Sequence, residues 1–143
     1  MQDIDELLCD CLYFTANKLS RIMGKIAEEE FKITGISPTY AFLVTIVNKK
    51  EGASQKEIGE ALHMTPSTIT RFIDKLESKD LVKRKMDGKN SYIYPTEKGR
   101  DAQPCIDKAW NNLYKRYSNK ISCEEGEGII TKLNEIIERL EKE

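Results

Sequence analysis

The hydrophobic periodicity changes near residue 81, and this change constrains the fold more than any other feature of the sequence. Segments 54–64 and 65–79 carry apolar residues at helical spacing, and a tight turn separates them. The next stretch, LVKRKMDGKNSYIYPT, contains two extended runs around the turn residues DGKN, and Pro95 ends the second run. The order helix, turn, helix, hairpin predicts a winged helix-turn-helix.

Signals for helix ends support this division. Ser54 and Glu57 match a capping box, and Thr65 followed by Pro66 is typical of a helix start. Short helices with such clear starts predict that the two segments fold as separate helices across the turn.

The flanking segments are also helical in pattern. Residues 3–31 form one long helical pattern, and Ser37 starts a short apolar helix that ends before the turn EGAS. Thr96 starts a helix that runs to about residue 119, in which Pro104 predicts a kink or a local break. A last helix follows Ser122. We therefore expect a mainly α fold with a small β-hairpin wing (α+β).

The outer face of the second short helix is rich in short polar side chains. At 100° per residue, Ser67, Thr70 and Arg71 lie opposite the apolar side. Thr65 and Thr68 can serve as capping residues, but capping does not explain Thr70, whose branched β carbon is a mediocre choice on an exposed helix. Hydroxyl groups beside an arginine can hydrogen-bond to base edges and phosphates. This helix is therefore predicted to read DNA bases.

The charge distribution points to the same partner. The net charge is −1, yet residues 79–100 hold seven basic and three acidic side chains. A local cationic patch suggests an anionic partner, although a solvated surface of mixed charge gives the same composition. The predicted DNA contacts are Ser54, Gln55, Lys56, Thr65, Ser67, Thr68, Thr70, Arg71, Lys75, Lys79, Arg84, Lys85, Asp87 and Lys89.

Nearly the whole chain resembles the MarR family, the multiple-antibiotic-resistance regulators. The most diagnostic stretches are SQKEIGEALHMTPSTITRFIDKLESKDLVKR at 54–84 and TEKGR at 96–100. The resemblance implies a homodimeric regulator of transcription, most often a repressor that a ligand or an oxidant releases from a near-palindromic double-stranded operator. The sequence departs from the family in the wing, where Asp87-Gly88-Lys89 stands in place of an Asp-x-Arg element.

The resemblance also suggests a division of the single domain 1–143. Residues 37–95 form the winged helix-turn-helix part, and residues 1–36 and 96–143 form a helical dimerisation part. In the last helix, Ile129, Leu133, Ile136 and Leu140 form a seam that needs a partner.

Two regulatory routes follow from the resemblance. Helices that border the family's effector cleft carry aromatic and basic residues, which suits a small aromatic or anionic effector. These residues are Tyr13, Phe14, Lys18, Arg21, Tyr40 and Trp110. An aromatic core with solvated cations explains them equally well.

The second route is oxidation of Cys9. Cys9 with Tyr13 and Tyr40 is similar to the arrangement in organic-hydroperoxide regulators of the family, although Ser37 stands where a further tyrosine is expected. A small packing residue is the alternative role for Cys9.

Other classes of function find little support. The chain has one histidine and no CxxC motif, so we expect no metal site, no cofactor and no enzymatic constellation. The acidic N-terminus and the lack of a long apolar stretch predict a cytoplasmic protein without a membrane span. A winged helix that contacts proteins instead of DNA is the alternative, but it requires an exposed apolar anchor, which residues 66–79 lack.

Overall fold

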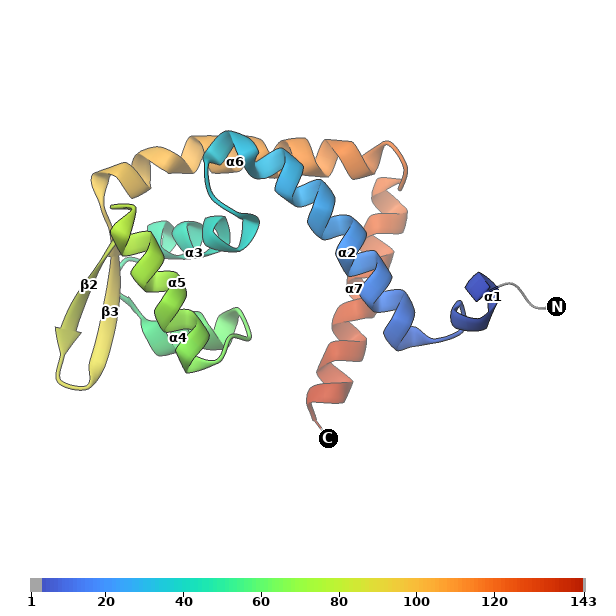
Figure 1. Ribbon diagram of the computed structural model, residues 1–143, viewed down its shortest axis with the longest axis horizontal. Coiled ribbons are helices and arrows are strands. Elements are labelled where there is room, and N and C mark those ends of the chain that lie inside the picture. The colour runs from blue at the N-terminus through green and yellow to red at the C-terminus, as the bar shows by residue number, and fades with distance from the viewer. Residues whose placement is uncertain (1–3, 143) are drawn as a thin grey trace.

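The computed structural model describes residues 4–142 and is mainly helical, with one small antiparallel sheet (Figure 1). The elements are α1 (Ile4–Leu8), α2 (Leu12–Phe31), the 3-10 turn η1 (Lys32–Thr34), α3 (Pro38–Lys49), β1 (Ala53–Ser54), α4 (Gln55–Ala61), α5 (Pro66–Ser78), β2 (Val82–Asp87), β3 (Asn90–Pro95), α6 (Glu97–Ser118) and α7 (Cys123–Glu141). The predicted α+β class with a hairpin wing is confirmed.

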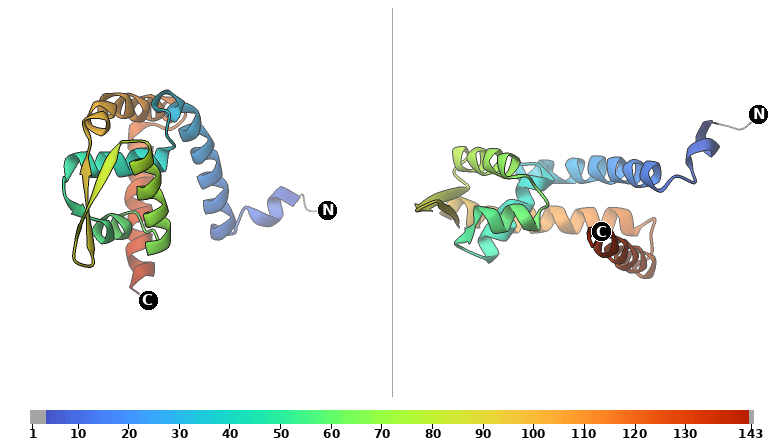
Figure 2. Two further views of the ribbon diagram at one scale, coloured as in Figure 1. Left: turned by 60° about the vertical axis from the view of Figure 1, so that its left-hand side comes forward. Right: turned by 90° about the horizontal axis from the view of Figure 1, so that it is seen from below.

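The long helix α6 joins two differently built halves of the chain (Figure 1). Helices α3, α4 and α5 and the hairpin β2–β3 lie beneath its first half, and α7 leaves from its far end. Helix α1 stands apart from the body in every view (Figures 1 and 2).

The core lies inside the winged helix-turn-helix. Its buried side chains come from α2, α3, β1, α4, α5, β2, β3 and α6, and Leu43, Ile73, Leu76, Ile93 and Ile106 are fully enclosed. Ile69, Ile73 and Leu76 are the buried residues of α5, so the helical periodicity of this segment correctly identified the side that faces the core.

The predicted helix starts agree with the structure. Ser37, Ser54, Thr65, Thr96 and Ser122 each cap a helix with a side-chain oxygen that accepts a backbone N–H bond. These caps place the beginnings of α3 to α7 where the sequence predicted them, because capping depends only on neighbours three residues away.

The predicted continuous helix at 3–31 is wrong, and residue 3 itself lies outside the described residues. The backbone turns at Cys9 and Asp10, and a new helix starts after Cys11, whose backbone is extended. The apolar residues keep their helical spacing across this turn, but α1 has only five residues and is too short to be stable as an isolated helix. Cysteine and aspartate are also weak helix formers.

The segment EGAS is more than the predicted turn. Ala53 and Ser54 form strand β1, which pairs with Ile93 and Tyr92 of β3 and makes the sheet order β1-β3-β2. A two-residue strand has too few side chains to show a period of two. The pairing of β1 with β3 connects the start of α4 directly to the wing.

Of the two outcomes predicted at Pro104, the local break is wrong, because α6 continues through this residue, and the kink stays a prediction. Proline removes one backbone donor, but Ile106, Ala109 and Leu113 bury the next turns of the same helix. Tertiary packing therefore keeps the helix intact past the proline.

The second half of the chain leaves large apolar side chains uncovered. Helix α7 has no buried residue among those described. Ile129, Ile130, Leu133, Ile137 and Leu140 are each 44–59% exposed. On α1 and α2, Ile4, Leu8, Leu12, Leu19 and Ile22 are 39–73% exposed. Apolar exposure on this scale in two long helices is typical of a surface that associates with another chain.

Across residues 4–142, we find no helix with both the length and the apolar character that a membrane span needs.

Candidate nucleic-acid interface

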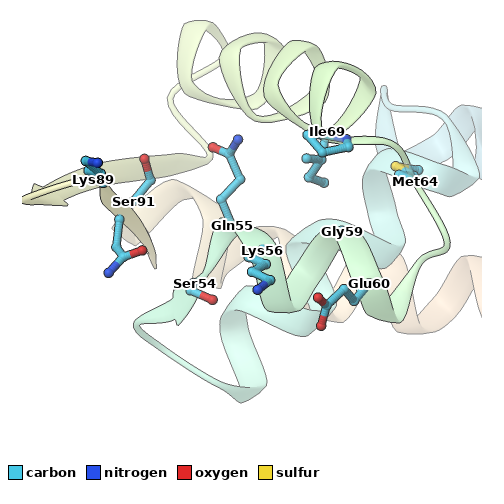
Figure 3. Close-up of a pocket in the computed structure, with 11 residues that line it drawn as sticks. Ser54, Gln55, Lys56, Gly59, Glu60, Met64, Ile69, Lys89 and Ser91 are labelled. Carbon is cyan, nitrogen blue, oxygen red and sulfur yellow. The ribbon is translucent and has the colours of Figure 1, made fainter.

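A groove of about 570 Å³ lies between α4, the start of α5 and the wing (Figure 3). Its floor contains Met64, Pro66 and Ile69, and polar side chains from α4 and the wing line the remainder. Gln55, Lys56 and Lys89, which the sequence predicts as DNA contacts, meet here from two distant segments. The tip of the wing, α4 and the N-terminal end of α5 thus lie on one side of the molecule (Figure 1).

The predicted recognition face of α5 is accessible. Ser67, Thr70, Arg71 and Lys75 are exposed, whereas the opposite side of the helix faces the core. Arg71 and Lys75 make no side-chain hydrogen bond or ion pair with any residue in the described range 4–142. Two cationic side chains that lack partners within the chain can serve an external anion.

Two other residues predicted to contact DNA, Ser54 and Thr65, act as helix caps. The Ser54 hydroxyl accepts the Glu57 N–H at 3.1 Å and caps α4. The Thr65 hydroxyl accepts the Thr68 N–H at 3.4 Å and donates to the Thr68 hydroxyl at 2.8 Å. Capping alone therefore explains why hydroxyl residues stand at 54 and 65.

Electrostatics stabilise the start of α4 as well. The Ser54 backbone N–H, and next the Lys50 ammonium, hold the pKa of Glu57 below its usual value. Glu57 is therefore ionised at neutral pH, as the reciprocal half of the capping box requires. This box fixes the backbone from which Gln55 and Lys56 project.

Arg84 is placed differently from its prediction as a phosphate contact. Its side chain is only 19% exposed, and its Nη1 atom lies 2.9 Å from Asp74 Oδ1 and 3.5 Å from Glu77 Oε1. Two carboxylates neutralise this guanidinium inside the fold. These two ion pairs offset the charge that Arg84 could offer to a phosphate, and its contact with DNA stays a prediction.

The wing presents its lysine side chains to solvent. Gly88 adopts a φ of 63° in the two-residue loop between Asp87 and Asn90, a conformation that favours glycine. Lys89 is exposed at this tip, and Lys85 lies 4.9 Å from the centre of the Tyr94 ring. The exposed Asp87 neighbours Lys89, and Lys79 ends α5 at its C-cap.

A second cavity, of about 590 Å³, lies between α2, α3, α5 and α6. Tyr40, Phe42, Phe72 and Trp110 contribute aromatic rings to its lining, and the Tyr40 and Phe72 ring centres are 4.6 Å apart. Glu28 is the one charged side chain that lines it among the described residues. This cavity can accept a flat apolar or cationic molecule.

Only part of the predicted effector set reaches this cavity. Tyr40 and Trp110 line it. The other four predicted residues do not line the cavity, because they lie on the first half of α2. These are Tyr13, Phe14, Lys18 and Arg21. The predicted basic contacts for an anionic effector thus do not line this cavity, whereas the acidic Glu28 does, and their role stays a prediction.

Cys9 is exposed in the turn between α1 and α2. Its Sγ atom lies 3.2 Å from the Glu6 carbonyl oxygen and 3.9 Å from Asp10 Oδ1. Reactive thiols generally lie beside a positive charge, which neither contact supplies. The packing role is not seen in this chain, and oxidation of Cys9 stays a prediction.

Several residues at these sites were not predicted. Asn90 and Ser91 line the groove, and Met23, Phe42 and Phe72 line the cavity. The pairing of Asp87 with Asn90 around DGKN could have identified the first two. The cavity residues are spread over separate helices, and no local pattern brings them together.

Comparisons with known proteins agree with this architecture. The MarR family model matches residues 36–90. The uncharacterised HTH-type transcriptional regulator YybA of Bacillus subtilis is 26% identical over 129 residues, which cover 87% of this chain and 85% of YybA. The transcriptional regulator BldR of Sulfolobus solfataricus is 28% identical, with a TM-score of 0.76 over 97% of this chain and 99% of BldR.

A further solved structure shares the fold at lower identity. The Staphylococcus aureus MepR–DNA complex gives a TM-score of 0.79 at 19% identity, over 90% of this chain and 97% of MepR. The family model spans the helix-turn-helix and the first part of the wing, and the relatives extend the match over both flanking helical segments. Residues 36–90 therefore match the MarR family, and the chain as a whole is similar to winged helix-turn-helix transcriptional regulators of that family.

Proposed function

We propose that this protein is a homodimeric repressor that binds a near-palindromic double-stranded DNA operator and leaves it when a small aromatic molecule binds. The observation that carries the DNA half of the proposal is the accessible polar face of α5. Arg71 and Lys75 are exposed on this helix, and Lys56 and Lys89 line the groove beside its start. DNA-binding proteins usually contact base edges with one helix and contact phosphates on both sides of that helix.

The surface composition favours DNA over a protein partner. In the described range, none of the exposed large apolar side chains lies on α4 or α5. A protein-binding winged helix needs such an anchor, whereas DNA needs hydrogen-bond donors and cations. The exposed apolar residues of α2 and α7 lie instead at the far end of α6 and support a dimer.

Selection from a randomised double-stranded DNA pool tests the DNA-binding proposal. A two-fold dimer presents two copies of α5, so we expect enrichment of an inverted repeat whose half-sites are about 34 Å, one helical turn, apart. A scrambled sequence of equal composition is the control, measured at the same salt concentration. Enrichment of no sequence, or of an unpaired half-site, would contradict the proposal.

The aromatic cavity supports release by a ligand. Phe72 belongs to α5 and lines the cavity together with Tyr40 of α3. A molecule that separates these rings has to move α5 against the rest of the core, which couples binding to the DNA-reading helix. The lining favours a neutral or cationic aromatic compound, because Glu28 would repel an anion.

Trp110 allows a direct test, since it is the single tryptophan of the chain. Flat aromatic cations that enter the cavity are expected to quench its fluorescence and to release operator DNA over the same concentration range. Glu28→Gln should weaken this binding about tenfold by removing a partly desolvated charge pair, and an isosteric neutral ligand should bind both proteins equally. Tight binding of an aromatic carboxylate with little effect of Glu28→Gln would contradict the assignment.

A further inference from the structure

Arg84, Gln55 and Thr70 form a chain of hydrogen bonds that joins the wing to both helices of the helix-turn-helix. Arg84 Nη2 donates to Gln55 Oε1 at 3.4 Å, and Gln55 Nε2 donates to Thr70 Oγ1 at 2.8 Å. The Thr70 hydroxyl in turn donates to the Pro66 carbonyl oxygen at 2.9 Å. The three side chains come from β2, α4 and α5, which are separate segments of the chain.

The direction of this chain is fixed by donor chemistry. A guanidinium can only donate, so the amide oxygen of Gln55 has to face Arg84 and the amide nitrogen has to face Thr70. Figure 3 shows this orientation, with the Gln55 side chain rising from α4 toward α5 and its oxygen on the side of the wing. Thr70 uses its only hydrogen on Pro66, so it accepts from Gln55.

Arg84 is itself held firmly. Asp74 and Glu77 of α5 flank its guanidinium at 2.9 and 3.5 Å, and its backbone N–H donates to Glu77 Oε2 at 3.2 Å. Its Nε atom is buried and has no hydrogen-bond partner among the described residues. A mostly buried cation with an unpaired donor is a costly way to gain stability. Its exact placement between three elements therefore calls for a second role.

We propose that Arg84 is a positioning residue that fixes Gln55 and Thr70 as a single base-reading unit. The inference rests on the DNA-binding function proposed above and names the residues that set its specificity. Gln55 lines the groove that opens beside the wing, so the amide remains within reach of a ligand there. With its oxygen bound to Arg84 and one N–H bound to Thr70, it offers a single free N–H donor.

The fixed orientation determines what the pair can read. A glutamine that recognises adenine uses both its oxygen and its nitrogen, and in Gln55, Arg84 occupies one lone pair of the oxygen while Thr70 occupies one of the two N–H groups. The remaining N–H can donate to a major-groove acceptor, which guanine offers at N7 and O6, adenine at N7 and thymine at O4. Thr70 adds a methyl group and an acceptor lone pair, because its hydrogen is also engaged. The Gln55–Thr70 pair therefore prefers a base pair in one orientation to the same base pair reversed.

The experiment compares Arg84→Gln and Gln55→Ala with Lys56→Gln. Each protein is titrated, over a range of salt concentrations, with the sequence selected by the wild type and with its scrambled form. We expect both Arg84→Gln and Gln55→Ala to lower the ratio of specific to scrambled affinity about tenfold. Gln55→Ala should not change the salt dependence, because it removes no charge. Arg84→Gln should change it little, because the Arg84 guanidinium is engaged by Asp74 and Glu77 and makes no phosphate contact under this proposal. Lys56→Gln should instead reduce the salt slope by about one per phosphate contact and keep the ratio.

Repeating the selection with Gln55→Ala should remove the preference at one base pair of each half-site. Thermal melting checks that each variant is folded. If Arg84→Gln does not fold, Gln55→Ala alone decides the test, since Gln55→Ala leaves the ion pairs of Arg84 intact. A smaller salt slope for Arg84→Gln with an unchanged ratio makes Arg84 a phosphate contact and overturns the inference, as does an unchanged ratio for Gln55→Ala. If the wild type itself selects no sequence, the proposed DNA-binding function fails and this inference with it.

Discussion

Leu133→Glu is expected to convert the protein from a dimer into a monomer and to lower its operator affinity at least about 100-fold. Leu133 is 44% exposed at the middle of the apolar side of α7, which has no buried residue of its own among those described. Covering the rest of such a side chain contributes on the order of 1 kcal/mol, so the five exposed residues of α7 together contribute roughly 5 kcal/mol per subunit. That amount is comparable with the whole stability of a small domain.

The substitution acts on association rather than on folding. A carboxylate buried without a partner costs about 3–5 kcal/mol, and a two-fold interface contains two copies of it. The core of α3, α5, β3 and α6 does not include Leu133, so the far-ultraviolet circular dichroism should stay close to that of the wild type. A monomer still presents one α5, but it loses the simultaneous binding of two half-sites.

Sedimentation measures the oligomeric state, and gel shifts with the selected operator measure affinity. Thr131→Glu is the matched control, because it adds the same charge to the opposite side of α7 two residues away. The control should remain dimeric. A Leu133→Glu protein that stays dimeric with wild-type operator affinity would refute the proposed interface.

Arg71→Ala should abolish sequence discrimination while the protein stays dimeric and folded. A good arginine–base contact contributes about 1–3 kcal/mol of discrimination, and a dimer makes it twice, so the expected loss is about 2–6 kcal/mol for the operator. Arg71 is exposed and makes no side-chain contact with the described residues that its removal could disturb. Its loss should therefore leave the melting temperature nearly unchanged.

Competition between operator and scrambled DNA gives the measurement. Lys108→Ala removes an equal charge from the exposed side of α6, outside the predicted DNA contacts, and should retain discrimination. A similar loss in both variants would show that net charge, not base reading, is responsible. Discrimination by Arg71→Ala equal to that of the wild type would remove α5 from the role of recognition helix.

Short-range signals in the sequence determined most of the secondary structure of this protein. The caps at Ser54 and Thr65 act on backbone groups three residues away, and the buried positions of α5 follow from helical periodicity. The hairpin followed from turn residues between two strand-forming runs. Each of these features is encoded within about ten residues, so the sequence alone was sufficient.

Tertiary structure decided the features that depend on distant segments. Helix α1 ends at Leu8 despite continuous periodicity, because periodicity shows which side is apolar but not whether a partner covers it. The tertiary structure placed the first half of α2 away from the aromatic cavity and left Glu28 there. It also placed Arg84 at the centre of an internal network, because the strand brings the guanidinium beside two carboxylates 7 and 10 residues earlier in the chain. Ion pairing and burial depend on three-dimensional proximity, which no local pattern around Arg84 encodes.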